Sequence, residues 1–330
     1  MTPTRPWLPL AAVGFTLVAW SSAFVAIRHL GEDVPPGSLS LGRLIIATAA
    51  LGVMVLVSVP AARRRLPTRR EWPLIAIGGV SWIGVYNVTL NESEQRIDAA
   101  TAALIVQIGP IIVALLATFF FNERLTRWLL IGLGVGFAGV VIIGRASSSG
   151  GNGDVLGVLL SAVAAVTFAI GVISQKKLLG SGMTALEMTF WFYVVGTVAC
   201  LPWTFELVGV VGDASAADLG WIAYLGIVPS ALAFVTWAYA LNRSDAGKFA
   251  MSTFLVPFIT TLMAWALLGE VPPAMAFVGG ALCIAGVLLT RRKPRVARGA
   301  PEAGSGDPGS VRPPQTDHNS PPERAGAGER

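Results

Sequence analysis

Ten apolar runs, most of them about twenty residues long, dominate this 330-residue chain and limit what it can fold into. A helix of about twenty residues crosses the roughly 30 Å hydrocarbon layer of a bilayer at about 1.5 Å per residue. The runs are longer and more uniformly apolar than the strands of a membrane β-barrel, so helices must satisfy the backbone in lipid. We therefore predict an all-α integral membrane protein with ten transmembrane helices, at residues 8–28, 38–59, 73–92, 98–121, 127–144, 155–175, 185–205, 218–240, 246–268 and 273–290.

The charge distribution predicts the orientation of these helices. Charged residues make up only 13% of the chain, and the basic ones cluster in short segments between the runs, which argues against nucleic-acid binding. One set of alternate segments carries 17 lysines and arginines, and the other set carries three. Because lysine and arginine are concentrated in cytoplasmic loops, we expect both termini in the cytoplasm. The 20 arginines against 4 lysines point to a bacterial source, so the expected location is the inner (plasma) membrane.

A repeat at a constant offset of 147 residues divides the chain into two related parts. The residues that recur at this offset include Pro110 and Pro257, Glu123 and Glu270, and Gly132 and Gly279. Each part holds five runs, an odd number, so the second part enters the membrane in the opposite orientation, as in many secondary transporters. We expect a first five-helix repeat at 1–145 and an inverted second repeat at 146–290. Residues 291–330 are rich in Pro, Gly and Ser and are expected to form a disordered cytoplasmic tail.

These residues resemble a known family. The prolines of the fourth and ninth runs, the closing glutamates in NERLT (122–126) and LLGEV (267–271), and LGRLIIATAAL (41–51) are similar to the EamA-type transporters of the drug/metabolite transporter superfamily. The resemblance covers residues 8–290. It implies a secondary transporter, more often an exporter, that moves a small organic metabolite such as an amino acid by alternating access. The family also carries other metabolites and toxic compounds, so the substrate, the direction and the coupling ion stay open.

Polar and aromatic side chains near the middle of the runs are the candidate substrate contacts around a midplane cavity, because polar groups in a membrane face protein or water. They are Trp20, Ser21, Arg43, Tyr86, Asn87, Gln107, Thr167, Ser230 and Thr253. Arg43 lies about five residues inside its run, and three interpretations remain open for it. It snorkels to the outer surface, it pairs with Glu92 or Glu94, or it contacts an anionic or zwitterionic group of the substrate.

Side-chain chemistry ranks these candidates. A serine or threonine can bond to the i−4 carbonyl of its own helix, so each one taken singly is a weak candidate. Asn87 and Gln107 are stronger candidates, because we expect that an amide does not satisfy itself in this way. Trp237 lies near the cytoplasmic end of its run and is interpreted as an aromatic residue of the membrane interface.

Pro110 and Pro257 fall close to the bilayer midplane, one in each half. A proline lacks an N–H and therefore frees the carbonyl four residues before it. The freed carbonyls belong to Val106 and Thr253. We expect each proline to kink its helix and to act as a hinge beside a shared central site.

The other repeated residues have structural interpretations. A glutamate at the C-terminus of a helix opposes the helix dipole, so Glu123 and Glu270 are expected to serve the start of the following helix. Gly132 and Gly136, together with Gly279 in the second half, form small-residue faces that favour close helix packing.

Several classes of function lack the residues they need. The two histidines and two cysteines form no cluster, so we expect no metal site and no cofactor, and no convergent acid, base or nucleophile supports an enzyme. No run has a carboxylate near its midpoint, which disfavours a multidrug or cation exporter that works through a central acid. Glu94, near the end of a run, could still couple transport to a proton.

The alternatives of a different class are a membrane-embedded enzyme and a passive scaffold. The expected partners are a small-molecule substrate and the lipid bilayer, and no nucleic acid. The oligomeric state stays open, with a monomer plausible.

Overall fold

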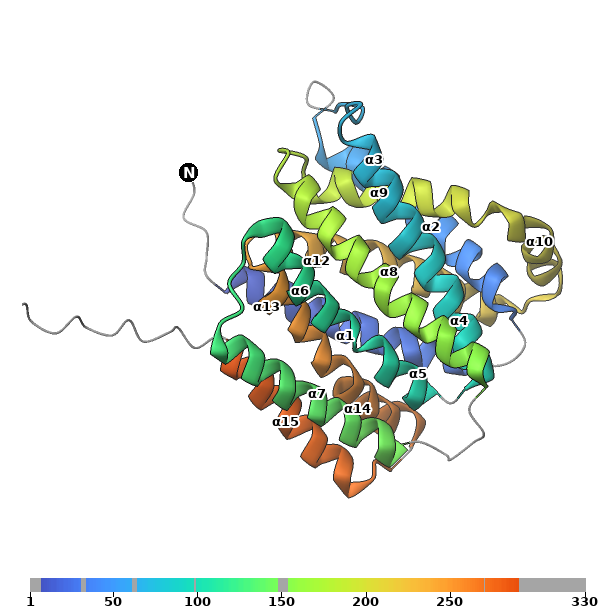
Figure 1. Ribbon diagram of the computed structural model, residues 1–330. Helices are drawn as coiled ribbons and strands as arrows, with labels where there is room; N and C mark the ends of the chain where they lie inside the picture. The colour runs from blue at the N-terminus through green and yellow to red at the C-terminus, as the bar shows by residue number, and fades with distance from the viewer. Residues whose placement is uncertain are drawn as a thin grey trace, which may run out of the picture. The chain divides into compact units, whose positions relative to one another are not determined.

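We describe the protein from a computed structural model, which defines residues 7–30, 34–60, 64–97, 99–147, 154–269 and 271–290 (Figure 1). The chain divides into two compact units, Met1–Lys293 and Pro294–Arg330, and every described residue lies in the first. The expected disordered tail and Glu270 lie outside the described residues.

All secondary structure of the described residues is helical. In chain order the elements are α1 (Leu8–Leu30), α2 (Pro36–Ser58), α3 (Trp72–Gly78), η3 (Gly79–Val85), α4 (Tyr86–Arg96), α5 (Ala99–Val106), α6 (Gly109–Phe121), α7 (Arg127–Ser147), α8 (Val155–Leu179), α9 (Ala185–Ala199), η4 (Leu201–Trp203), α10 (Thr204–Asp213), α11 (Ala216–Leu225), η5 (Gly226–Leu232), α12 (Ala233–Leu241), α13 (Ala246–Ala250), η6 (Met251–Leu255), α14 (Val256–Leu268) and α15 (Ala274–Thr290).

The prediction of an all-helical membrane protein is confirmed, with fewer full spans than expected. Among the described residues, eight helices or continuous helix groups are long and apolar enough to cross a membrane. A ninth candidate bends by 53° between Ala185–Ala199 and Leu201–Asp213. The tenth expected span, at 273–290, corresponds to α15, an apolar helix of 17 residues.

Contacts between helix ends define two faces of the helical unit. On one face the Lys177 ammonium lies 5.8 Å from the ring of Phe120, and the Lys176 ammonium donates to the carbonyl of Leu241. We call this the basic face. On the opposite face, the acidic face, Arg96 pairs with Asp154 at 3.2 Å and with Glu92 at 2.7 Å.

Local sequence sets where several helices begin. Asp154, Thr184 and Ser215 each precede a helix and accept a backbone N–H from its first turn, a donor that the helix itself cannot satisfy. Asp154 accepts from the Leu156 amide at 2.9 Å. This bond, together with Arg96, holds the pKa of the Asp154 carboxyl below its ordinary value.

The backbone conformation repeats at the 147-residue offset. Two π-helical segments, η3 (Gly79–Val85) and η5 (Gly226–Leu232), occupy corresponding positions. The residues that close α6 and α14, Asn122 and Gly269, both adopt positive φ, 52° and 72°. Because both irregularities recur at one spacing, the repeat extends from the sequence to the local structure.

Each expected proline kink coincides with a break in its helix. Pro110 lies in the first turn of α6 after α5 has ended at Val106, and Pro257 lies in the first turn of α14 after the 3₁₀-helical η6. Proline suits a first turn because the N–H that it lacks would have no partner there.

The glycine faces of α7 and α15 lie against each other, and Figure 1 shows these two helices side by side. A Cβ added to Gly132 would come within 2.7 Å of the Gly286 carbonyl, and one added to Gly279 within 2.6 Å of a carbonyl of α7. Gly136 faces η6, where a Cβ would meet the Phe254 ring at 2.6 Å. Larger residues at these positions would force the helices apart.

The expected role of Glu123 needs a correction. Its carboxylate does not cap the following helix, whose first turn is capped by Thr126. Instead it accepts the backbone N–H groups of Ala246 at 2.7 Å and Gly247 at 3.1 Å, at the start of α13 in the other repeat. The unpaired donors and the positive end of the helix dipole attract a carboxylate there. Glu123 therefore ties the two repeats together at the basic face.

Candidate functional site

Arg43 lies inside the helical unit rather than on its surface. Its side chain projects from α2, is 7% exposed, and donates from Nε to Ser230 Oγ of η5 at 3.2 Å. Ser230 in turn donates to the Leu225 carbonyl of its own helix at 2.7 Å. The structure therefore disfavours the snorkelling interpretation, since the guanidinium is bonded within the unit to the other repeat.

Three more titratable side chains lie near this guanidinium. Tyr193 of α9, Tyr86 of α4 and Glu94 of α4 lie close enough to interact with Arg43 electrostatically, and Tyr193 also hydrogen-bonds to Ser230. We call Arg43, Ser230, Tyr193, Tyr86 and Glu94 the Arg43 cluster. It draws residues from both repeats.

Glu94 is the acid of this cluster. Its Oε1 is shielded from solvent and has no hydrogen-bond partner among the described residues. Glu92, the other acid considered for Arg43, instead pairs with Arg96 at the acidic face. A buried cation and a half-buried acid with one shielded, unused oxygen thus lie within one polar cluster.

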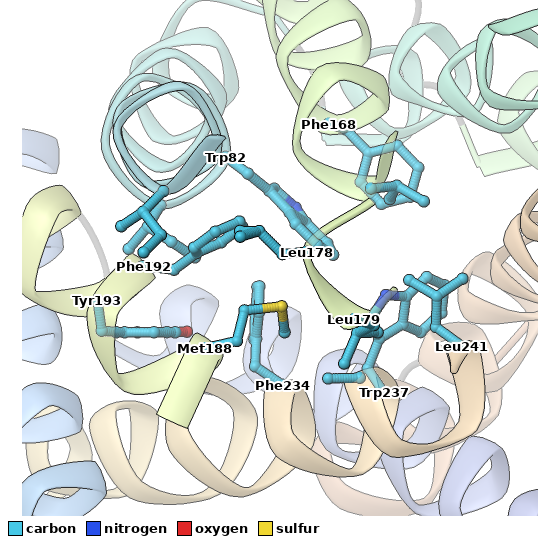
Figure 2. Packing of buried hydrophobic residues seen from close by; sticks show 14 of the residues in the cluster. Trp82, Phe168, Leu178, Leu179, Met188, Phe192, Tyr193, Phe234, Trp237 and Leu241 are labelled. Atoms are coloured by element: carbon cyan, nitrogen blue, oxygen red, sulfur yellow. The ribbon is translucent and has the colours of Figure 1, made fainter. Parts of the chain in front are cut away.

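A continuous series of aromatic rings leads from this cluster toward the basic face. The ring centroids of Tyr193 and Phe234 lie 5.4 Å apart, those of Phe234 and Trp20 5.4 Å, those of Trp20 and Trp237 4.8 Å, and those of Trp237 and Phe249 4.3 Å. We call these five residues the aromatic column. Figure 2 shows Phe234 between Tyr193 and Trp237, with Trp82 and Phe168 beside them. Trp237 is fully buried here, so its interpretation as an interface aromatic is wrong.

Two candidates from α1 contact the second repeat. Trp20 donates from Nε1 to the Pro229 carbonyl at 3.1 Å, and Ser21 donates from Oγ to the Val256 carbonyl at 3.2 Å. Trp20 belongs to the aromatic column, whereas Ser21 fixes α1 against the start of α14.

Gln107 and Thr253 bond to each other across the repeats. Gln107 donates from Nε2 to the Thr253 carbonyl at 2.8 Å, and Thr253 Oγ1 donates to the Ala250 carbonyl at 2.8 Å. Both residues are buried at the breaks beside the prolines. Their polar groups serve this junction in the present conformation.

The structure corrects the expectation for Asn87 and Thr167. The Asn87 amide reaches back one turn and donates to the Ile83 carbonyl of its own chain segment at 2.8 Å, although we expected that an amide would not do so. Thr167 bonds the carbonyls of Val163 and Ala164 and lies on an apolar groove of about 460 Å³ along the outward side of α8. It is about 100° around the helix from the buried Phe168, because successive residues of a helix turn by that angle.

Sequence reasoning missed four residues that the structure places in or beside the site. Tyr193, Phe234 and Trp82 belong to apolar runs, where an aromatic ring gives the same pattern whether it faces lipid or protein. Gln175 gave a detectable signal, an amide at the end of an apolar run. The predicted span at 155–175 ends at this residue, whereas α8 continues to Leu179.

The arrangement can bind a small molecule that carries both charges. Arg43 offers a donor to a carboxylate, Glu94 offers an acceptor to an ammonium group, and the aromatic column offers apolar faces between them and the basic face. Among the described residues no group of three His, Cys, Asp or Glu side chains could hold a metal ion.

Comparisons with known proteins show what the chain is similar to. The family model described as the EamA-like transporter family matches residues 7–145 and 155–292. A "Probable terminal-alkyne amino-acid exporter" of Streptantibioticus cattleyicolor is 37% identical over 282 residues, which is 86% of this chain and 93% of that protein. A "Probable amino-acid metabolite efflux pump" of Salmonella typhimurium is 26% identical over 297 residues, 87% of this chain and 96% of that protein.

A solved crystal structure shares the fold. It superposes with a TM-score of 0.70 at 20% sequence identity, over 87% of this chain and 97% of that one. At this identity the likeness concerns the fold alone.

Proposed function

Since the chain belongs to the EamA-like transporter family, we propose that it exports a small zwitterionic metabolite, an amino acid or a close relative of one. The observation that carries this proposal is the position of Arg43. Inserting an arginine costs roughly 2.5–3.5 kcal/mol at the centre of a membrane helix and less toward the end, where Arg43 lies. Here it is bonded to the opposite repeat, in one cluster with the incompletely bonded Glu94.

Arg43 and Glu94 bind opposite charges of the substrate. The planar guanidinium of Arg43 binds the substrate carboxylate, and Ser230 and Tyr193 orient that guanidinium. Glu94 Oε1 accepts from the substrate ammonium. The aromatic column contacts the substrate side chain, which suits neutral amino acids with apolar side chains. The two relatives whose names mention amino acids support the same class.

We further propose the membrane arrangement in which this export occurs. Ten spans form two inverted five-helix repeats, at 1–145 and 146–290, in the inner membrane of a bacterium. The basic face is cytoplasmic, together with both termini, so the substrate moves from the basic to the acidic face. Reporter fusions test this topology: a cytoplasm-active reporter at Arg298 should be active and one at Ser148 inactive. Equal activity at both sites would contradict an inverted repeat of five spans.

Transport measurements in membrane vesicles test the function. Everted vesicles that contain the protein should accumulate labelled propargylglycine, a terminal-alkyne amino acid, and some members of a panel of labelled neutral amino acids. Vesicles with Arg43→Ala should lose this accumulation at equal protein content. Accumulation of no amino acid by the wild-type protein would contradict the proposal.

A cation exporter is the second candidate, because the half-buried Glu94 and the aromatic faces would also suit an organic cation. Ethidium therefore belongs in the same panel. Accumulation of ethidium without any amino acid would favour this candidate.

A further inference from the structure

A second group of buried polar atoms lies nearer the basic face than the Arg43 cluster. Gln175 of α8 and Trp237 of α12 are both 0% exposed. Gln175 Oε1, Gln175 Nε2 and Trp237 Nε1 have no hydrogen-bond partner within the described part of the chain. Buried polar groups are nearly always paired, so three unpaired atoms at one depth indicate a ligand that they receive.

The two side chains lie at the same depth on neighbouring helices. Gln175 lies four residues before Leu179, the last residue of α8, and Trp237 lies four residues before Leu241, the last residue of α12. Lys176 donates to the Leu241 carbonyl at 2.9 Å, which holds the two helix ends together. Gln175 and Trp237 are therefore both about one helical turn inside the basic face.

A cavity of about 650 Å³ opens at the basic face next to this level. The residues that line it include Lys176, Asn242, Arg243, Lys248, Phe249 and Ser252. Phe249 also packs against the Trp237 ring at 4.3 Å between centroids. One aromatic ring thus connects the wall of the cavity with the unpaired indole N–H of Trp237.

We propose that Gln175 and Trp237 form an entry subsite, which binds the head group of a neutral amino acid before it reaches the Arg43 cluster. This inference rests on the proposed function. A zwitterion supplies both an acceptor and a donor, the two kinds of hydrogen-bond partner that the subsite lacks. Its carboxylate accepts from Trp237 Nε1 and Gln175 Nε2, and its ammonium group donates to Gln175 Oε1. The cavity lining carries three cations, Lys176, Arg243 and Lys248, against one acid, Asp245, so its net positive charge attracts the carboxylate. Phe249 moves aside to admit it.

The position of the subsite completes a path through the unit. Trp237 is in contact with Trp20, and Trp20 with Phe234, which touches Tyr193 of the Arg43 cluster. The entry subsite and the Arg43 cluster therefore occupy opposite ends of the aromatic column. In this conformation the packed rings close the path between them.

Two variants test the subsite without removing its bulk. Gln175→Leu keeps the approximate volume and deletes the amide, and Trp237→Phe keeps an aromatic ring and deletes the N–H. Everted vesicles present the basic face to the medium, and initial rates of labelled propargylglycine uptake against its concentration give an apparent KM. Each variant should raise this KM about tenfold, as the loss of a hydrogen bond to a charged group predicts. Gln95→Leu on the exposed part of α4 and Trp72→Phe at the start of α3 are matched controls and should leave KM unchanged.

Thermal unfolding of the purified proteins separates binding from folding. If the unpaired polar groups have only a structural role, Gln175→Leu and Trp237→Phe should stabilise the protein and leave KM within twofold of the wild-type value. That result in both variants would overturn the inference. Should Gln175→Leu fail to fold, Trp237→Phe alone decides. If the wild-type protein accumulates no amino acid, the proposed function fails and this inference fails with it. Normal transport by the wild-type protein together with an unchanged KM in both variants overturns the subsite and leaves the proposed function standing.

Discussion

Gln107 donates from Nε2 to the backbone carbonyl of Thr253 at 2.8 Å, so the helix break of one repeat is bonded to the break of the other. The Thr253 carbonyl is the one that Pro257 leaves without a donor four residues later. A freed carbonyl in a membrane must find a partner within protein or water, and here it accepts from the Val256 N–H of its own 3₁₀ turn and from Gln107 of the opposite repeat. The two breaks are therefore mechanically coupled in this conformation.

Removing the Gln107 amide should weaken this junction. In Gln107→Leu the buried Thr253 carbonyl keeps the Val256 N–H and loses its partner in the opposite repeat, which should destabilise the protein by about 0.5–1.5 kcal/mol. Thermal unfolding of the purified variant should show a lower midpoint, and propargylglycine export should slow. Gln95→Leu, on the exposed part of α4, controls for the loss of a glutamine. An unchanged midpoint together with normal transport would show that the junction bond is dispensable.

Restoring a backbone N–H at the breaks should straighten the helices. In Pro110→Ala and Pro257→Ala the new N–H can bond the carbonyl four residues earlier, at Val106 or Thr253. We expect normal insertion and expression with slower transport in each variant, and the slowest transport in the double variant. Full transport by the double variant at wild-type protein content would show that the prolines are not hinges.

The Arg43 side chain should not be replaceable by lysine. Lysine keeps the charge but has no Nε to bond Ser230 and no planar fork for a carboxylate. Arg43→Lys should therefore fold normally and transport propargylglycine at least about tenfold more slowly, as the loss of a charge-assisted bond predicts. Arg127→Lys at the start of α7 is the matched control. Normal transport by Arg43→Lys would leave Arg43 with a structural role only.

The membrane fold could be predicted from the sequence because lipid imposes the same rule on every span. The long apolar runs, the offset of 147 residues and the two proline breaks each produce a linear pattern. The structure contains the breaks at Pro110 and Pro257 and the close packing of α7 on α15. Span lengths were less predictable, since a helix bends or ends according to its neighbours.

The site was only partly predictable, because which way a side chain faces depends on packing. Arg43 and Ser230 stood out as polar residues in apolar runs, and the structure bonds them to each other. Thr167 had the same signal but faces away from the core. Tyr193 had no polar signal to separate it from its apolar neighbours, and Glu123 contacts a helix more than 120 residues away in the sequence, at Ala246.

A carboxylate outside the membrane spans should give the stability an acid dependence. Arg65 forms two bonds of 2.7 Å to Glu71 and is the main reason that the pKa of this carboxyl lies well below its usual range; Thr68 and Ser181 add further bonds. A depressed pKa contributes stability above the ordinary carboxyl pKa of about 4.3, and the contribution is lost as the pH falls toward the folded value.

The Glu71→Gln variant tests this dependence. Its thermal midpoint in detergent should lie below that of the wild-type protein by a constant amount between about pH 5 and 8. The gap should narrow as the pH falls below about 4, where the wild-type carboxylate begins to lose its advantage. Glu206→Gln, on the exposed α10, should match the wild-type protein at every pH. A gap that does not change with pH would mean that the charge of Glu71 is not responsible.

Neutralising Glu123 should loosen the basic face. The carboxylate accepts two N–H groups at the start of α13, whereas a glutamine has one acceptor oxygen and no negative charge to interact favourably with the positive end of the helix dipole. Glu123→Gln should therefore lower the free energy of unfolding by about 0.5–2 kcal/mol. If export requires this end of the unit to open, the variant should also spend more time open toward the basic face.

Thiol labelling measures that opening. A cysteine introduced as Ser252→Cys lines the basic-face cavity, and both native cysteines, Cys200 and Cys283, are buried. In everted vesicles a membrane-impermeant thiol reagent should label this position faster when Glu123→Gln is also present. Asp245→Asn, which removes the exposed pair with Lys248 and leaves both Glu123 bonds to α13 in place, is the control and should not change the rate. Equal labelling rates with and without Glu123→Gln would show that the bond to α13 stabilises the fold without restraining the basic face.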